Sequence, residues 1–323
     1  MTTRAVVIGS GHYLPERIVP NAEFEQIVET SSEWIVARSG IERRHFAAEG
    51  EMTSDLAAHA ARAALADAGI TANELDALIV ATSTADLTFP SAATMVQAKI
   101  GMMGGFAFDV QAVCAGFIFA MAQANALILS GQAKRVMVIG AETFSRLMDW
   151  TDRTTCVLFG DGAGAVILEA QTGAGSARDR GILACDLNSD GRHRELLYVD
   201  GGVSTGTVGH LRMEGKEVFR HAVEKLAQTA QNALDKAGLD SGDVDWIVPH
   251  QANIRIIQGT AKKMNLPMEN VVVTVQDHGN TSAASIPLAL DAGVRSGQMK
   301  PGQLVMLEGV GGGFAWGSVL LRY

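Results

Sequence analysis

Residues 64–82, ALADAGITANELDALIVAT, match residues 233–251, ALDKAGLDSGDVDWIVPHQ, without a gap. Identical residues recur at the same spacing: Ala64, Leu65, Ala68, Gly69 and Asp76 in the first copy correspond to Ala233, Leu234, Ala237, Gly238 and Asp245 in the second. Each copy has the pattern of an amphipathic helix that ends at a glycine, followed by a polar turn and an apolar strand. The sequence therefore predicts helices over 53–68 and 217–237, with a buried strand after each.

The similarity continues beyond the two copies. In the first half, a strand over 106–112 precedes a helix over 115–130 and the strands RVMVIGAE (135–142) and GAGAVILE (162–169). In the second half, the strand NVVVTV (270–275) precedes a helix over 283–296 and the strands QLVMLEGV (303–310) and AWGSVLLRY (315–323). This self-similarity predicts an α/β protein of two duplicated halves, in which crossover helices cover the sheets. We divide the chain at 1–172 and 173–323, inside a loop-rich stretch between 170 and 210.

The duplication is expected to bring three polar loops together. Cys114 in DVQAVCAGF (109–117) precedes the central helix of the first half, and the loop QDHGNTSAAS (276–285), which contains Asn280, corresponds to it in the second half. His250 aligns with Ala81 at the end of the repeated strand. Because equivalent strand ends of duplicated halves face one crevice, we expect Cys114, His250 and Asn280 to lie close together in space.

Residue types alone leave the roles of these side chains open. Cysteine attacks as its thiolate, which a helix N-terminus and a nearby imidazole both favour. A free cysteine is nevertheless among the most buried residue types, so without further context core packing is the better interpretation of Cys114. His250 is alternatively a cap of the next helix, and Asn280 an ordinary turn residue. His278 is a rival for the role of Asn280, unless Asp277 holds it as a structural pair.

Of three glycine-rich stretches, one is a candidate oxyanion-binding site, and the other two do not fit a dinucleotide site or a phosphate loop. The three glycines of EGVGGGFAWG (308–317) follow an apolar strand and let backbone N–H groups approach a developing oxyanion, unless they form only a tight turn between strands. VIGSGHYLP (7–15) lacks the third glycine of a dinucleotide site and has Pro15 where a helix would run. FGDGAGAVIL (159–168) lacks the Lys-Ser/Thr of a phosphate loop, and we expect it to pack strands closely beside the site.

Composition narrows the class of protein. The chain has 323 residues and a formal net charge of −9, which argues against general nucleic-acid binding. Its three cysteines show no CxxC spacing, so neither a disulfide framework nor a zinc site is expected. No window approaches 18 uninterrupted apolar residues, and the N-terminus lacks the pattern of a signal peptide. We therefore expect a soluble cytoplasmic protein that binds neither nucleic acid nor membrane.

Four motifs, in this order along the chain, resemble those of the β-ketoacyl-acyl carrier protein synthase III family: DVQAVCAGF, HQANIRI (250–256), DHGNTSAASIPLAL (277–290) and GVGGGFAWGSVL (309–320). The resemblance covers essentially the whole chain. It implies the thiolase fold, whose duplicated halves form a layered αβαβα core. It also implies the condensing reaction that begins bacterial type II fatty acid synthesis. A short acyl-CoA, expected to be acetyl-CoA, acylates the enzyme, and malonyl-acyl carrier protein then condenses with the acyl group and loses CO₂ in a ping-pong cycle.

The resemblance assigns roles residue by residue. It makes Cys114 the nucleophile, His250 and Asn280 its partners, and the backbone N–H groups of Cys114 and Gly312 the oxyanion donors. The positions matching coenzyme A contacts are Thr30, Trp34, Arg38, Arg153, Met213, Gly215, Phe219 and Asn253. The positions matching carrier-protein docking are Lys216, Gln251, Ala252, Asn253, Ile254, Arg255 and Lys262. Phe89 matches a residue that reaches the partner subunit's acyl pocket, which implies a homodimer. No metal or prosthetic group is implied, because acyl-CoA is a substrate.

The resemblance leaves some assignments open. Carrier proteins are acidic, so docking on a chain of net charge −9 requires a local basic surface. Arg255 and Lys262, seven residues apart on one predicted helix, fit such a surface. Val113 stands where the family more often has Ala and Ala315 where Thr is common, which puts the length of the acyl primer in doubt. The alternatives are the same chemistry in a secondary-metabolite pathway, or a Cys-His-Asn thioester hydrolase that releases free acid.

Overall fold

Two mixed β-sheets form the frame of the molecule, and the computed structural model describes all residues, 1–323. The first sheet has the order β1-β7-β6-β4-β5, with bounds Thr2–Tyr13, Asp161–Gly173, Arg135–Thr143, Ala77–Ala81 and Phe106–Val110. The second has the order β11-β12-β13-β8, with bounds Trp246–Pro249, Leu304–Gly311, Ala315–Arg322 and Gly181–Ser189. In both sheets a parallel pair (β4 with β6, β11 with β12) is followed by two antiparallel pairs, and the first sheet has β5 as an additional parallel strand beside β4. The predicted duplication of an α/β unit is confirmed at the level of strand order and direction.

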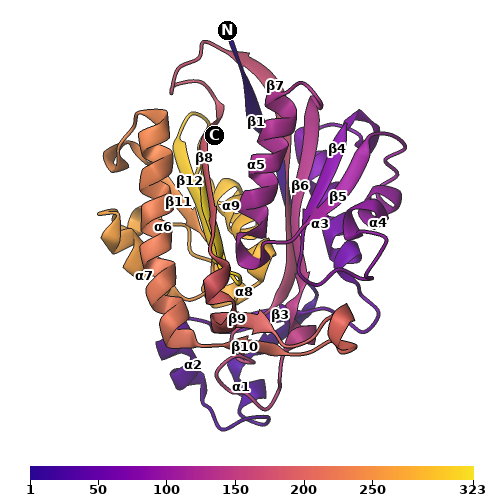
Figure 1. The fold of residues 1–323 in the computed structure, drawn as a ribbon, viewed down its shortest axis with the longest axis vertical. Helices are drawn as coiled ribbons and strands as arrows, with labels where there is room; N and C mark the ends of the chain where they lie inside the picture. Colours follow the sequence, from indigo (N-terminus) through magenta and orange to yellow (C-terminus); the bar gives the residue numbers. More distant parts are fainter.

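Helices cover the sheets in three layers (Figure 1). α3 (Thr53–Ala68) packs on the outer face of the first sheet, and α6 (Gly215–Ala237) packs on β8, β12 and β13 of the second. α5 (Gly116–Leu129) and α9 (Ser285–Arg295) each contact strands of both sheets and so lie between them. The order helix, sheet, helix, sheet, helix is the αβαβα core that was predicted.

The repeated stretch forms the same local structure in both halves. α3 ends at Gly69, with φ of 67°, and β4 follows after a short 3₁₀ turn. α6 ends at Gly238, with φ of 66°, and β11 follows after another such turn. Both glycines adopt the left-handed conformation that commonly ends a helix. The predicted helices 53–68 and 217–237 therefore agree with the structure to within two residues.

One predicted strand does not form. Within NVVVTV (270–275), only Val271 pairs with a strand, as an isolated parallel bridge to Ile247. The side chain of Gln251 binds the backbone that follows: its amide donates to the Val272 carbonyl at 3.0 Å and its oxygen accepts the Thr274 N–H at 2.8 Å. α8 (Val275–His278) then begins. The prediction of a strand here was wrong, because a buried side chain takes the place of a fifth strand.

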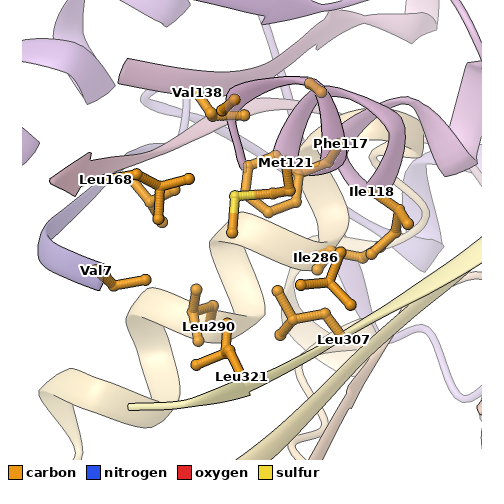
Figure 2. Packing of buried hydrophobic residues seen from close by; sticks show 14 of the residues in the cluster. Val7, Phe117, Ile118, Met121, Val138, Leu168, Ile286, Leu290, Leu307 and Leu321 are labelled. Atoms are coloured by element: carbon orange, nitrogen blue, oxygen red, sulfur yellow. The ribbon is translucent and has the colours of Figure 1, made fainter. Parts of the chain in front are cut away.

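The main core lies between the two sheets and holds 28 buried residues (Figure 2). Phe117, Ile118 and Met121 of α5 and Ile286 and Leu290 of α9 are its centre. Side chains from both sheets close around them: Val7, Val138, Leu168, Leu307 and Leu321. α5 is apolar on nearly every side because it is covered by a sheet on each face, which also fixes the position of Cys114 just before its first turn.

Glycines let strands pack closely against helices in the two stretches that the sequence excluded as nucleotide sites, VIGSGHYLP (7–15) and FGDGAGAVIL (159–168). A Cβ on Gly11 of β1 would lie 2.3 Å from the backbone nitrogen of Ala64, so β1 approaches α3 more closely than any other residue allows. A Cβ on Gly164 of β7 would lie 2.7 Å from the backbone nitrogen of Leu288 in α9. Close packing is therefore present at FGDGAGAVIL, but the partner of β7 in this contact is the helix α9 and not a second strand.

The remaining elements form the rim of the molecule. Their bounds are β2 Arg17–Pro20, β3 Arg43–Phe46, β9 Leu197–Val199, β10 Leu211–Met213, α1 Asn21–Phe24, α2 Ser32–Ser39, α4 Ala92–Lys99 and α7 Ile254–Lys263. The division at 172/173 falls at the end of β7 and stays a prediction. None of the helices is both long and apolar enough to cross a membrane.

Candidate active site

A pocket of about 710 Å³ opens between α2, α6 and α7 and reaches the ends of the central helices. Cys114, His250 and Asn280 all line it. These residues come from the loop before α5, the end of β11 and the loop after α8. The structure thus brings together the three side chains whose proximity the duplication predicted.

Cys114 lies in a 3₁₀ turn, Val113–Ala115, directly before α5. Val113 has a φ of 50°, which is rare for a β-branched residue and marks a strained turn. The glycine-rich loop lies against the same turn, because a Cβ on Gly311 would be 2.7 Å from the backbone nitrogen of Cys114. Only a glycine at position 311 allows this approach.

The thiol of Cys114 is buried, and burial raises its pKa to about 12. Its sulfur lies 3.5 Å from the Ser282 hydroxyl oxygen, to which it donates. A position at a helix N-terminus by itself favours the thiolate, whereas burial makes the neutral thiol the resting form. Attack on a substrate therefore requires a group that accepts the thiol proton.

His250 is held as a neutral imidazole. Its backbone N–H donates to the Glu308 carbonyl at 2.8 Å, and burial lowers the pKa of its ring to about 3. The ring Nδ1 lies 2.5 Å from the Ser285 hydroxyl oxygen, which also accepts the Gln251 N–H at 3.3 Å. Nδ1 is the only hydrogen-bond acceptor that the Ser285 hydroxyl contacts, so we assign the hydroxyl proton to this bond, which leaves the imidazole proton on Nε2.

Ser285→Ala tests this tautomer assignment. Without the hydroxyl, Nδ1 loses its donor and the neutral ring is free to carry its proton on either nitrogen. For the condensation that the sequence resemblance implies, we expect kcat to fall about 10-fold to 100-fold, with little change in KM for the expected acyl-CoA substrate. Steady-state kinetics measure both constants. Ser285→Thr keeps the hydroxyl and should retain most of the activity; equal loss in both variants would contradict the assignment.

Asn280 presents the donor end of its amide to the pocket. Its Oδ1 accepts the backbone N–H of Ser282 at 2.9 Å, so the amide nitrogen remains available to bind another group. Its backbone pairs with Leu158 and Gly160, which fixes the loop. His278, the rival for this role, does not line the pocket. Asp277 does not hold His278 either, because its carboxylate pairs with Arg43.

The mouth of the pocket is basic and aromatic. Arg38, Arg153, Lys216 and Arg255 line it, and no aspartate or glutamate does. The guanidinium groups of Arg38 and Arg153 lie 4.8 Å and 5.1 Å from the centroid of the Trp34 ring. In a chain of net charge −9 this concentration of cations marks a site for an anionic ligand.

Most of the positions implied for coenzyme A line this pocket: Trp34, Arg38, Arg153, Met213, Gly215, Phe219 and Asn253. Asn253 also caps α7, since its side-chain oxygen accepts the Arg255 N–H at 2.8 Å. Thr30 is the exception. It lies outside the residues that form the pocket, and its hydroxyl is buried without a hydrogen-bond partner.

The positions implied for carrier-protein docking are divided between surface and interior. Arg255 and Lys262 are exposed on α7, Lys216 is exposed at the start of α6, and Ala252, Asn253 and Ile254 are partly exposed. Gln251 is fully buried. Its amide is used by the backbone of Pro249, Val272 and Thr274, so its assignment to a docking surface was wrong.

A second cavity, of about 1,390 Å³, lies on the other side of the cysteine turn. Val113 lines both cavities, while Gly312 and Ala315 line only the second. Phe89 is 82% exposed in the single chain. No group of three or more His, Cys, Asp or Glu side chains is arranged to hold a metal ion.

Three polar side chains around the site were not foreseen from the sequence: Ser282, Ser285 and Glu142. The two serines were visible in DHGNTSAAS at a spacing of three residues, which places them on one side of a helical turn. The turn Ser282–Ala284 before α9 is the counterpart of Val113–Ala115 before α5. Aligning these two turns would have placed Ser282 opposite the cysteine. Glu142 gave no such signal, because β6 reads as an ordinary buried strand.

Comparison with known proteins agrees with this geometry. A family model described as 3-oxoacyl-[acyl-carrier-protein (ACP)] synthase III matches residues 108–191, and the model of its C-terminal part matches 234–323. A Ruegeria pomeroyi protein named beta-ketoacyl-[acyl-carrier-protein] synthase III is 75% identical over 323 residues, covering 100% of both chains.

Solved structures give the same result. The 3-oxoacyl-[acyl-carrier-protein] synthase III of Aquifex aeolicus has a TM-score of 0.93 and 45% identity, covering 99% of this chain and 100% of that one. The priming β-ketosynthase of the R1128 polyketide pathway has a TM-score of 0.92 and 35% identity, covering 99% and 96%. Full-length identity of this level and a shared thiolase fold show that this chain belongs to the β-ketoacyl-acyl carrier protein synthase III family.

Proposed function

We propose that the chain condenses a short acyl-CoA, acetyl-CoA in the first instance, with malonyl-acyl carrier protein, releasing CoA and CO₂ and starting fatty acid synthesis. The observation that carries the proposal is the pocket itself. It has Cys114, His250 and Asn280 at its inner end and four cations without a carboxylate at its mouth. A phosphate-bearing thioester fits such a pocket with its phosphates at the mouth and its carbonyl beside the sulfur.

In the first half-reaction, the Cys114 sulfur attacks the thioester carbonyl as the thiol gives up its proton. The carbonyl oxygen becomes an oxyanion, for which the N–H groups of Cys114 and Gly312 are the proposed donors. Collapse of this intermediate breaks the bond to the CoA sulfur. CoA leaves as a thiolate and takes a proton from water. The acyl group remains on Cys114.

In the second half-reaction, malonyl-carrier protein enters the same pocket and loses CO₂. The electron pair left behind forms an enolate, whose oxygen receives hydrogen bonds from Nε2–H of His250 and the amide of Asn280. Both donors are neutral, so neither needs to be deprotonated and neither repels the developing negative charge. The enolate carbon attacks the acyl-Cys114 carbonyl, and the β-ketoacyl product leaves on the carrier protein.

The mouth residues would hold the coenzyme. An adenine ring stacks between Trp34 and Arg153 only if Arg153 moves away from the indole ring that it now covers. Lys216 and Arg255 remain free to meet phosphate oxygens.

The carrier protein is proposed to dock on α7 and the start of α6, over Lys216, Arg255 and Lys262. We expect Lys262→Glu to raise KM for malonyl-carrier protein about 10-fold at low salt without changing KM for acyl-CoA, because Lys262 lies outside the pocket. Arg255→Glu should raise both constants. The effect should fade as salt is added, because the charges are exposed.

Lys134→Glu is the matched control for this experiment. Lys134 is equally exposed but lies next to β6 at the end opposite the catalytic loops. An equal rise in KM in the control, or a rise that salt does not reduce, would contradict docking on α7.

A homodimer is also proposed. β5 is an edge strand of the first sheet, and exposed apolar side chains gather on and near it: Leu87, Phe89, Met103 and Phe106. An apolar sheet edge of this kind is suited to pairing with a second copy. Phe89 would then enter the partner's second cavity, which we propose as the acyl pocket. Phe89→Ala should widen the range of acyl chains accepted, and a chain that sediments as a monomer at micromolar concentration would contradict the dimer.

Two further features complete the proposal. The three cysteines are free thiols, the usual state in a reducing cytoplasm, where we place the reaction. No resident cofactor is proposed. The 75% identity to a Ruegeria pomeroyi protein named for this activity supports fatty acid synthesis over a polyketide pathway, whose priming ketosynthase is 35% identical.

A condensation assay with a series of acyl-CoA substrates tests the proposed function. With malonyl-carrier protein present, we expect a β-ketoacyl-carrier protein product, with the highest rate for the shortest acyl groups. Without malonyl-carrier protein, acyl-CoA should give one acyl group per active site and no steady release. Steady release of free acid in that reaction would instead indicate a hydrolase.

A further inference from the structure

A chain of hydrogen bonds leads from Cys114 away from the substrate pocket. The sulfur lies 3.5 Å from Oγ of Ser282, and that hydroxyl donates to Oε1 of Glu142 at 3.1 Å. Neither Ser282 nor Glu142 lines the pocket that holds Cys114. The thiol therefore faces a substrate on one side and a buried carboxylate, one hydroxyl away, on the other.

Glu142 is completely buried near the end of β6, and it is surrounded by donors. Oε2 accepts the Thr84 hydroxyl at 2.6 Å and the Thr82 hydroxyl at 3.3 Å, and the Ser83 N–H reaches both oxygens. No lysine, arginine or histidine bonds to it, and Cys114 is the titratable group that it influences. Asp161 on the neighbouring strand is bound by Ser145 and Ala47 instead.

The donors and the burial act on Glu142 in opposite directions. Burial disfavours the carboxylate, while the hydrogen bonds from Thr84, Ser83 and Ser282 favour it, and the pKa of Glu142 rises to about 7 as a result. A carboxyl group with this pKa exchanges a proton readily near neutral pH. It is the buried carboxyl group that hydrogen bonds connect to the thiol, whereas the ring of His250 is neutral with its Nε2 assigned as a donor.

We propose that Ser282 and Glu142 are a proton relay for Cys114. As the sulfur attacks the thioester, the thiol proton passes to Oγ of Ser282, and the hydroxyl proton of Ser282 passes to Oε1 of Glu142. The inference rests on the acyl-transfer step proposed above. It adds a destination for the proton that the buried thiol must lose.

The relay also closes the catalytic cycle. Glu142 keeps the proton while the acyl group is on Cys114, so no negative charge lies behind the acyl-enzyme when the enolate forms. When the new carbon–carbon bond expels the cysteine thiolate, the proton returns through Ser282 and restores the thiol. CoA thiolate has meanwhile taken its proton from water, so the full cycle consumes one proton, as decarboxylation to neutral CO₂ requires.

Backbone strain at the two facing turns supports a functional arrangement. Ser282 has a φ of 49° and Val113 a φ of 50°, and these are two of the three non-glycine residues with positive φ in the chain. They occupy equivalent positions in the turns that precede α9 and α5. Strained residues persist where the surrounding structure holds them, often at active sites. In this strained conformation the Ser282 hydroxyl lies between the Cys114 sulfur and the Glu142 carboxylate.

The test measures single-turnover acylation by acetyl-CoA as a function of pH, followed by the mass of the intact protein. In the wild type, the rate should rise through an apparent pKa near 7, because Glu142 accepts a proton only when ionised. In Glu142→Gln the acylation rate at pH 7.5 should fall at least 10-fold, and the rise of the rate with pH near pH 7 should disappear. Ser282→Ala keeps the carboxylate but breaks the relay, and should also fall at least 10-fold.

Thr82→Val is the matched control, because it removes one hydrogen bond to Glu142 without interrupting the path to the sulfur. Its acylation rate should lie within about 3-fold of that of the wild type, and the rise of the rate with pH should occur at slightly higher pH. Thermal unfolding of each variant shows that the fold is retained.

The outcomes separate the relay from the proposed function. If the wild type forms no acyl-enzyme, acyl transfer itself is wrong. If the wild type is acylated and folded Glu142→Gln is acylated as fast or faster, the relay is wrong. A carboxylate that only lay near the thiol would oppose thiolate formation by its charge, so its removal would speed the reaction. The relay would also be wrong if the acylation rate of Glu142→Gln still rose with pH near pH 7.

Discussion

Cys114→Ala is expected to lower the rate of condensation at least ~10³-fold, because the acyl group then has no nucleophile to receive it. Decarboxylation of malonyl-carrier protein should continue, since the proposed donors for the enolate are His250 and Asn280. The released CO₂ and the β-ketoacyl product are measured in parallel. Loss of condensation with decarboxylation retained would show that the two half-reactions use separate groups.

Asn280→Ala is the complementary control. It removes a proposed enolate donor but leaves the thiol, so acylation by acyl-CoA should survive while decarboxylation falls about 100-fold. If Cys114→Ala and Asn280→Ala lost the same half-reaction, the assignment of acyl transfer to Cys114 and of decarboxylation to Asn280 would be wrong.

Glu308→Gln is expected to give the largest change in stability. Glu308 lies in the middle of β12 with both carboxylate oxygens buried and without hydrogen-bond partners. Burial raises the pKa of this carboxyl from 4.5 to about 8. Between these two values the folded protein keeps a proton that the unfolded chain releases, so the free energy of unfolding falls as pH rises through this window.

The carboxyl therefore destabilises the fold at pH 7 by up to about 3 kcal/mol. Glu308→Gln cannot ionise, so its stability relative to the wild type should be greater at pH 7 than at pH 5, and the share of the slope that Glu308 causes should disappear. Glu142, with a pKa raised to about 7, keeps its own share of the slope. Denaturant unfolding from pH 5 to pH 9 measures this. Glu269→Gln, at an exposed position, is the control. An unchanged slope between pH 5 and pH 8 in Glu308→Gln would contradict the assignment of this titration to Glu308.

The fold was predictable where local pattern and packing agree. The helices ending at Gly69 and Gly238 were visible because an apolar face, a glycine cap and the next strand follow one another in both copies. The strand NVVVTV was predicted wrongly, and Gln251 was wrongly placed on a docking surface, for the same reason. The buried amide of Gln251 binds the backbone beyond Val271, which neither hydrophobicity nor propensity reveals.

The site was predictable in its parts but not in its electrostatics. The duplication places Cys114 and Asn280 in equivalent loops, so their meeting followed from the sequence. The state of the thiol did not, because the effect of burial on its pKa depends on elements from both halves that enclose it. The Ser285 contact with His250 and the Ser282 contact with Glu142 likewise join residues far apart in the chain.

The most direct test of the account is to find the acyl group. Wild-type protein is incubated with acetyl-CoA, digested, and the peptides are identified by mass, before and after addition of malonyl-carrier protein. We expect one acetyl group, on the peptide that contains Cys114, and its disappearance when malonyl-carrier protein is added. An acetyl group on Cys156 or Cys185, no acetyl group at all, or one that persists in the presence of malonyl-carrier protein would contradict the assignment of Cys114 as the nucleophile.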